Sequence, residues 1–270
     1  MRAPTAAEIE AFRRDGVVCL RGVLPPELVA AMADPVEVAL GGDQVADLSA
    51  LAGAAADQAR FRAGVDHWRH QPEMRAFAAD SPLPGLVAAL MGSDAVFLYE
   101  DSVLAKEPGA AEATHWHQDL GYFHIEGTQV CTTWCPLDPV DAESGAVRFA
   151  AGSHRTGAFY RPNFFVSDEP IPGTEGDVVP DVDSAGLEIL SFDLAPGDIT
   201  VHDARTLHSS GPNRSAERRR RAISVRYCGD DARYRFRPGT PRKPEQADLR
   251  DGDRLGGPAH PQVWPISARA

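Results

Sequence analysis

The first ninety residues of the chain show hydrophobic and polar positions alternating with helical spacing. A first helix is predicted over residues 5–14, because Thr5 and Glu8 form a capping-box pattern and Gly16 lies just past the end. Further patterned segments are a strand at 17–24 and helices at 25–40, 71–80 and 81–92. We therefore expect residues 1–92 to be mainly helical.

After Gly92 the pattern changes to short β-type runs separated by Gly, Pro, Asp and Ser. The runs lie at residues 95–106, 114–123, 129–137, 146–152, 187–194, 198–204 and 221–227. Short strands at this spacing are typical of an antiparallel sandwich or a jelly-roll barrel. The fold class predicted is α+β, with a β core at residues 93–230 and helices packed outside it.

Two segments fall outside this pattern. Residues 160–184 are rich in Pro, Gly and Asp. The segment is too long for a tight hairpin turn and too aromatic at its start for a plain linker. We interpret them as a lid loop over a binding site. Residues 231–270 carry many prolines and charges without periodicity, and we expect an irregular segment there. Residues 1–270 are interpreted as a single domain.

Composition restricts the possible partners. The 270 residues are 43% hydrophobic, which is enough for a continuous core, and the formal net charge is -12. An acidic chain is a poor ligand for nucleic acid or anionic membranes. No signal-peptide or membrane-span pattern occurs, and the four cysteines are scattered as in a reduced protein. We expect a cytoplasmic protein that binds a small molecule, as a monomer or weak homo-oligomer.

The stretch from Thr114 to His124 contains a candidate metal site. Side chains at positions i and i+2 of a strand point the same way, so His117 and Asp119 can direct an imidazole and a carboxylate at one point. His115 has the same parity and is a possible third ligand. An isolated His-x-Asp also occurs by chance, so this stretch alone does not establish a metal site.

The second half of the chain offers the missing ligand. His208 follows a β-type run and precedes a turn, so a barrel can bring it to His117 and Asp119; His202 is a competing choice. Two histidines and one carboxylate on one face of an octahedral ion leave three positions open. This facial triad is typical of non-haem Fe(II) oxygenases.

Several further motifs make the chain resemble the phytanoyl-CoA dioxygenase family of Fe(II)/2-oxoglutarate-dependent oxygenases. They occur in the family's order: HQD at 117–119, WxPL at 134–137, ESGAVRFAAGSH at 143–154, GD at 197–198 and HxSGPNxS at 208–215. The resemblance implies a double-stranded β-helix, or jelly-roll, core. It also implies that His117, Asp119 and His208 are the catalytic iron ligands, with His202 outside the ligand set.

The resemblance further implies the cosubstrates 2-oxoglutarate and O2. A buried arginine would pair with the distal carboxylate of 2-oxoglutarate, because a guanidinium stays charged when desolvated. Aligning on the following strand selects Arg220, whereas counting from His208 selects Arg219; we favour Arg220. The other predicted cosubstrate contacts are Ser210, Gln118, Trp134 and Ser102.

The reaction implied is hydroxylation with release of succinate and CO2. An acidic chain with two lysines offers no evident site for a CoA thioester, so a small apolar natural product or lipid-like molecule is expected. The alternatives are a cupin-type metal dioxygenase or isomerase that needs no 2-oxoglutarate, and a non-catalytic binding barrel. Candidate substrate contacts are Lys106, His115, Tyr122, Tyr160, Phe164, Phe165 and Trp68.

Overall fold

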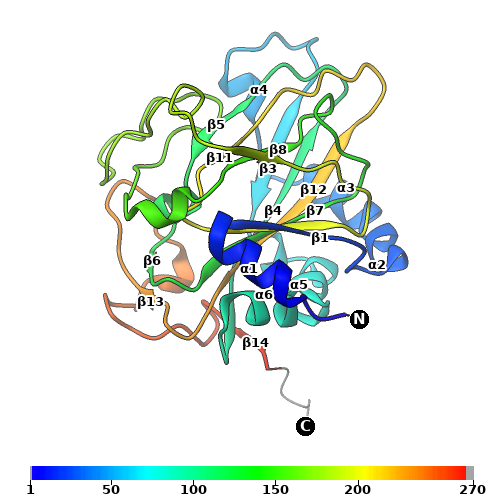
Figure 1. Cartoon of the computed structure of the whole chain (residues 1–270). Coiled ribbons are helices and arrows are strands. Elements are labelled where there is room, and N and C mark those ends of the chain that lie inside the picture. The colour runs from blue at the N-terminus through cyan, green and yellow to red at the C-terminus, as the bar shows by residue number, and fades with distance from the viewer. Residues whose placement is uncertain (1, 266–270) are drawn as a thin grey trace.

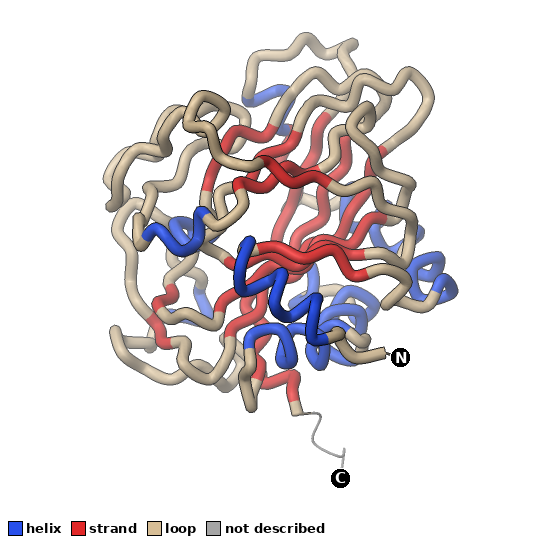
Figure 2. The backbone as a smooth tube through the Cα atoms, in the orientation of Figure 1, coloured by secondary structure: helices blue, strands red, loops and turns tan. Residues whose placement is uncertain are grey.

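Two antiparallel β-sheets form the centre of the molecule, as the computed structural model shows for residues 2–265 (Figures 1 and 2). The major sheet has the strand order β1-β10-β7-β12-β4-β3-β2, with β14 paired to β4, and the minor sheet has the order β5-β11-β8-β9. The strands of the major sheet are β1 (Val17–Leu20), β2 (Val45–Asp47), β3 (Phe61–Val65), β4 (Val96–Lys106), β7 (Val130–Pro136), β10 (Ile199–Asp203), β12 (Arg220–Cys228) and β14 (Gln262–Trp264).

The minor sheet lies across the long strands of the major sheet (Figure 1). Its strands are β5 (Thr114–His117), β8 (Val147–Ala150), β9 (Ile189–Ser191) and β11 (His208–Ser210), and β6 (Ile125–Glu126) pairs separately with β13 (Arg233–Tyr234). Side chains of both sheets line one shared cavity. Two facing antiparallel sheets are the arrangement that a jelly-roll requires.

β12 is the central strand of the major sheet and is buried for nearly its whole length between β4 and β7. β7 is fully buried, which explains its continuous run of apolar and small residues. Successive side chains of β12 point to opposite faces, so Arg220 and Arg221 leave the sheet in opposite directions. This alternation separates the inside of the barrel from its outer face.

Helices from the N-terminal part contact the major sheet. α6 touches β4, β7 and β14, and side chains of α5 and α6 share one hydrophobic cluster with those of β4 and β12. The helices are α1 (Ala6–Asp15), α2 (Pro26–Ala31), α3 (Ala33–Leu40), α4 (Leu48–Leu51), α5 (Pro72–Asp80) and α6 (Leu83–Met91). The capping box predicted for the first helix is confirmed: the Thr5 side chain accepts from the Glu8 amide, and Gly16 ends the helix at φ 77°.

The N-terminal part differs from its predicted helical character in two places. The helix predicted over residues 25–40 is broken into α2 and α3 at Met32. Strands β2 and β3 also occur there, because β3 pairs with the exposed edge of β4. That pairing depends on a strand over thirty residues away, so local periodicity did not reveal it. No helix among residues 2–265 is long and apolar enough to cross a membrane.

Candidate iron and 2-oxoglutarate site

Three side chains with metal-binding atoms converge between the two sheets. His117 ends β5, Asp119 begins a 3-10 helix (Asp119–Tyr122), and His208 begins β11 directly opposite His117. All three are buried, and their ligand atoms lie within 4.8 Å of one another. Nε2 of His117 and of His208 lie 3.8 and 3.7 Å from Asp119 Oδ1. The structure therefore brings together the three predicted ligands.

Backbone carbonyls orient both imidazoles. Nδ1 of His117 lies 2.8 Å from the His115 carbonyl oxygen, and Nδ1 of His208 lies 3.0 Å from the Thr206 carbonyl oxygen. A protonated Nδ1 donates to the carbonyl, which leaves the lone pair on Nε2 directed at the site. Burial, reinforced by neighbouring imidazoles, lowers the pKa of His117 to about 3 and that of His208 to about 4. Both rings are thus neutral and able to bind a cation at neutral pH.

The two oxygens of Asp119 have different partners. Oδ1 faces the histidines, whereas Oδ2 accepts a 2.5 Å hydrogen bond from Thr132 Oγ1 and lies 3.4 Å from His202 Nε2. Burial alone would raise the pKa of the Asp119 carboxyl, but His208, His202 and Arg226 hold it well below its usual range. Asp119 is therefore an anion with one oxygen available for a metal.

His202 lies beside this cluster without completing it. Its ring centroid is 4.3 Å from that of His208, and the side chain is buried. Neither of its ring nitrogens has a hydrogen-bond partner among residues 2–265. The group of mutually close ligand atoms contains His208 and not His202, in agreement with the preference for His208.

Arg220 lines the same cavity as the three candidate ligands. It is 1% exposed, its Nε and Nη2 have no hydrogen-bond partner in the described part of the chain, and its guanidinium sits 5.4 Å from the Trp134 ring centroid. Burial lowers its pKa to about 10, so the group remains charged at neutral pH. A buried cation with free donors fits the distal carboxylate of 2-oxoglutarate.

A second cation lies directly opposite Arg220. Lys106 pairs with Arg220 across β4 and β12, and its Nζ donates to Ser210 Oγ at 3.0 Å and to the Gly211 carbonyl at 2.7 Å. Burial, and then the Arg220 charge, lower the pKa of Lys106 well below its usual range. Like charges placed opposite one another destabilise a sheet unless an anion lies between them. Lys106 thus contacts Ser210, which lines this cavity, and it does not line the larger cavity as a substrate contact would.

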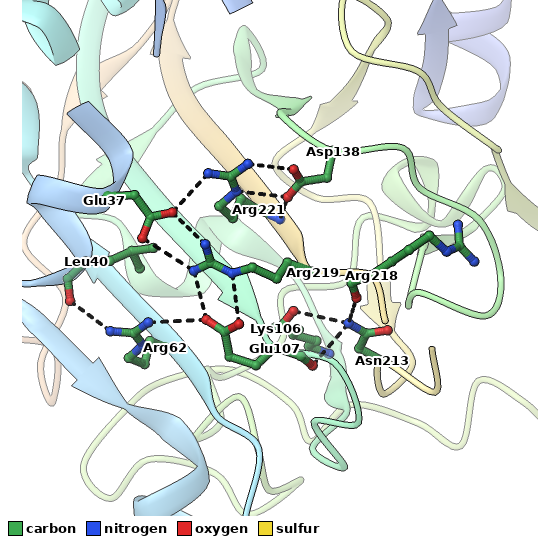
Figure 3. A network of polar contacts seen from close by, with 10 residues as sticks. All are labelled: Glu37, Leu40, Arg62, Lys106, Glu107, Asp138, Asn213, Arg218, Arg219 and Arg221. Carbon is green, nitrogen blue, oxygen red and sulfur yellow. Dashed lines mark hydrogen bonds and ion pairs between the residues drawn. The ribbon is translucent and has the colours of Figure 1, made fainter. Parts of the chain in front are cut away.

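Arg219 lies on the outer face of the barrel. Its guanidinium donates to Glu37 and to both carboxylate oxygens of Glu107 (Figure 3). Arg221 also points outward and bonds Asp138 and Glu37. Every charge of this outer group has an opposite partner, so Arg219 has no access to the cavity that Arg220 lines.

A larger cavity of about 570 Å³ adjoins the candidate metal site. Leu104, Asp119, Phe165 and Arg226 line both cavities. The other walls combine apolar and charged side chains, among them Phe61, Tyr122, Phe123, Ser102, Glu100, Thr240, Arg242 and Lys243. Phe165, from the predicted lid loop, packs its ring 4.8 Å from those of His117 and Tyr122. Residues 160–184 therefore bring one aromatic ring, that of Phe165, against the candidate metal ligand His117.

Some predicted contacts lie elsewhere. The Gln118 side chain bonds the backbone of Ala158, Tyr160 and Arg205, so its amide ties the lid loop down and does not line the cosubstrate cavity. Ser102 lines the larger cavity. Trp134 and Ser210 line the smaller cavity, together with the candidate metal ligands and Arg220.

The predicted substrate contacts also divide. Trp68 is buried in the main hydrophobic cluster, together with side chains of α5, and lines neither cavity. Phe164 is 48% exposed, and Tyr160 packs against a separate cluster formed by Ala150, Val182 and Leu207. The His115 carbonyl oxygen contacts Nδ1 of His117, but the His115 ring does not line the larger cavity. Tyr122 and Phe165 do line the larger cavity.

Two residues were missed by sequence reasoning. Thr132 holds Asp119, and Arg226 lines both cavities. Arg226 has the same strand parity as Arg220, which is a signal that could have identified it. Thr132 likewise has the same strand parity on β7 as the predicted contact Trp134, and both line the smaller cavity.

Comparisons with known proteins agree with this geometry. The family model described as "Phytanoyl-CoA dioxygenase (PhyH)" matches residues 12–222. A probable alpha-ketoglutarate-dependent hypophosphite dioxygenase from Stutzerimonas stutzeri is 31% identical over 50% of this chain, and the match spans 46% of that protein. A 1-deoxypentalenic acid 11-beta-hydroxylase from Streptomyces arenae is 27% identical, over 76% of this chain and 74% of the relative.

A solved structure covers nearly the whole chain. The epimerase SnoN, crystallised with Fe3+, alpha ketoglutarate and nogalamycin RO, is 27% identical with a TM-score of 0.73, over 95% of this chain and 97% of SnoN. SnoN thus binds both iron and alpha ketoglutarate. The smaller cavity of this chain contains groups that fit both: two neutral imidazoles and one carboxylate for the metal, and a buried guanidinium with free donors for the cosubstrate.

Proposed function

The chain belongs to the phytanoyl-CoA dioxygenase family and is an iron- and 2-oxoglutarate-dependent dioxygenase, and we propose that it hydroxylates a small, largely apolar molecule. Iron with 2-oxoglutarate and O2 supplies the oxidising chemistry, with succinate and CO2 as coproducts. The protein must hold the metal, orient the cosubstrate, and place one C–H bond of the substrate beside the iron.

In this proposal His117, Asp119 and His208 hold the iron. Thr132 fixes the second oxygen of Asp119, so that one oxygen remains for the metal. Three facial ligands leave open positions for a bidentate cosubstrate and O2.

We assign the deep end of the cavity to the distal carboxylate of 2-oxoglutarate. Arg220 would supply two parallel hydrogen bonds, and Lys106 and Ser210 would contribute a second charge and a hydroxyl. An anion at this point would compensate two buried cations that face one another across β4 and β12. Trp134 would pack against the guanidinium.

The larger cavity is the proposed substrate site. Its volume of about 570 Å³ suits a molecule of drug-like size, and Phe61, Leu104 and Phe165 give it apolar walls. SnoN belongs to nogalamycin biosynthesis, and the Streptomyces arenae relative hydroxylates 1-deoxypentalenic acid. These neighbours support a natural product as substrate. Closure of Phe165 over the site would exclude water.

The observation that carries this assignment is the buried, unpartnered Arg220 beside the His-Asp-His cluster. The test is an anaerobic titration of the metal-free protein with Fe(II) and then 2-oxoglutarate. We expect a visible charge-transfer band that requires both additions. Arg220→Gln should weaken the 2-oxoglutarate dependence of the band, while the matched control Arg219→Gln should leave it unchanged.

The same titration tests the rival cupin-type activity. An enzyme without need for 2-oxoglutarate has no use for an uncompensated guanidinium at the deep end of the site. Folded protein that binds Fe(II) but shows no band with 2-oxoglutarate would contradict the cosubstrate assignment. If the band forms, a screen of small apolar compounds, scored by succinate release, would identify the substrate.

A further inference from the structure

A second buried guanidinium borders the candidate iron site and has no part in the reaction proposed above. Arg226 lies on β12 and is 8% exposed. Its Nη1 donates to Ser102 Oγ at 2.5 Å, but its Nε is buried and has no hydrogen-bond partner within residues 2–265. A buried donor without a partner is destabilising, and more so when it is charged. A ligand that accepts from Arg226 would remove this cost.

Glu100, the carboxylate nearest to Arg226 on the neighbouring strand β4, also pairs with a second cation, Lys243. Glu100 Oε1 lies 3.7 Å from Arg226 Nη1, but Glu100 Oε2 accepts a 2.6 Å hydrogen bond from Lys243 Nζ. Lys243 also bonds Asp66 at 2.7 Å. Lys243 is therefore fully paired. Arg226 lies near two carboxylates, Glu100 and the candidate metal ligand Asp119, but its Nε bonds neither of them.

Arg226 and Arg220 are separate anion sites. They are six residues apart on the same face of β12, a separation of roughly 20 Å along the strand. A five-carbon diacid bound to Arg220 and to the metal is much shorter than this. Arg226 also lines the larger cavity, on the side where Asp119 borders it, and Arg220 does not. Arg226 thus faces the substrate from the metal side.

We propose that the substrate carries an anionic group, a carboxylate or a similar oxyanion, on a largely apolar body, and that Arg226 binds that group. The inference rests on the proposed function, since it places the substrate in the larger cavity. Phe61, Leu104 and Phe165 would contact the apolar body. Thr240 Oγ1, which also lines this cavity and has no hydrogen-bond partner within residues 2–265, would bind a neutral oxygen. A charge-assisted bond at Arg226 would fix which C–H bond faces the iron.

A matched pair of fluorescent probes tests the charge preference without knowledge of the substrate. 8-Anilinonaphthalene-1-sulfonate and N-phenyl-1-naphthylamine differ by one sulfonate, and both are small and apolar. With the anaerobic Fe(II)·2-oxoglutarate enzyme, we expect the sulfonate to bind about 10- to 100-fold more tightly than the neutral probe, as one charge-assisted contact predicts. Arg226→Met should abolish this preference, and Arg226→Lys should restore part of it.

The control is Arg221→Met, which removes one charge from the outer face of the same strand and should leave the preference intact. Equal binding of both probes, or a preference that survives Arg226→Met, would overturn the proposal. Weaker 2-oxoglutarate binding by Arg226→Met in the absence of probe would also overturn it, because Arg226 would then serve the cosubstrate. The charge-transfer band reports 2-oxoglutarate binding separately, so failure of the proposed function is distinguishable from failure of this inference.

Turnover gives an independent test. We would screen apolar carboxylic acids, each paired with its primary amide, for stimulated succinate release. Acids should stimulate and amides should not, and Arg226→Met should raise the KM of an active acid at least tenfold with a smaller change in kcat. Active amides with no active acids would contradict the proposal.

Discussion

The two faces of β12 hold their arginines in opposite circumstances. On the outer face, Arg219 and Arg221 are paired with Glu37, Glu107 and Asp138 (Figure 3). On the inner face, Arg220 and Arg226 are more deeply buried and have free donors. Charged side chains of the same type thus stabilise the fold on one face and await a ligand on the other. A buried charge without a partner is therefore a stronger sign of function than a cluster of paired charges.

The largest effect should separate Arg220 from Arg219. Arg220→Gln should weaken 2-oxoglutarate binding by about 100-fold, because two charge-assisted hydrogen bonds are lost in a buried site. Arg219→Gln should change it less than twofold. The measurement is the dissociation constant of 2-oxoglutarate for the Fe(II) protein, followed by the charge-transfer band. Similar losses in both variants would break the comparison.

Stability should change in opposite directions on the two faces. Arg220→Met should stabilise the ligand-free protein by about 1–3 kcal/mol, because it removes an uncompensated buried charge. Arg221→Met should destabilise it by about 1 kcal/mol, because it breaks a half-buried pair with Asp138. Denaturant unfolding of the metal-free protein measures both. Destabilisation by Arg220→Met would show that the guanidinium supports the empty fold.

A smaller effect concerns pH. In the empty site the pKa of Lys106 lies well below its usual range through burial and the Arg220 charge, and a bound carboxylate would raise it again. Binding of 2-oxoglutarate should therefore take up a proton at pH values between these two pKa values. Its affinity should fall as the pH rises through this window, by at most tenfold per pH unit. Calorimetry in buffers of different ionisation enthalpy measures the proton uptake, which Lys106→Met should abolish.

The smallest effect concerns salt. Ion pairs of the outer face are partly exposed, so 1 M NaCl should reduce the stability difference between the parent protein and Arg219→Met to a few tenths of a kcal/mol. The stability gain expected for Arg220→Met should persist, because salt does not reach a group that is 1% exposed. Thermal unfolding at low and high salt compares the two. Equal salt dependence would weaken the distinction between the faces.

Local patterns were sufficient for much of the fold. The sequence showed the capping box of α1, the change from helices to strands near Gly92, and the runs that form β4, β7, β10 and β12. Periodicity reveals such elements because it reflects which face of an element is buried. Strands β2 and β3 were not evident. Their existence depends on the edge of β4, which local sequence does not describe.

The same division holds for the site. The chemistry was evident in the linear pattern: HQD, the later histidine and the arginine run supply the candidate ligands and the cation, and the strand that follows the run indicated Arg220 as the inward one. The positions of the side chains follow from the folded chain. It placed Lys106 opposite Arg220, turned the Gln118 amide to the lid loop, and put Arg226 between the two cavities. Strand pairing and sheet stacking set these positions, since they join residues about a hundred positions apart.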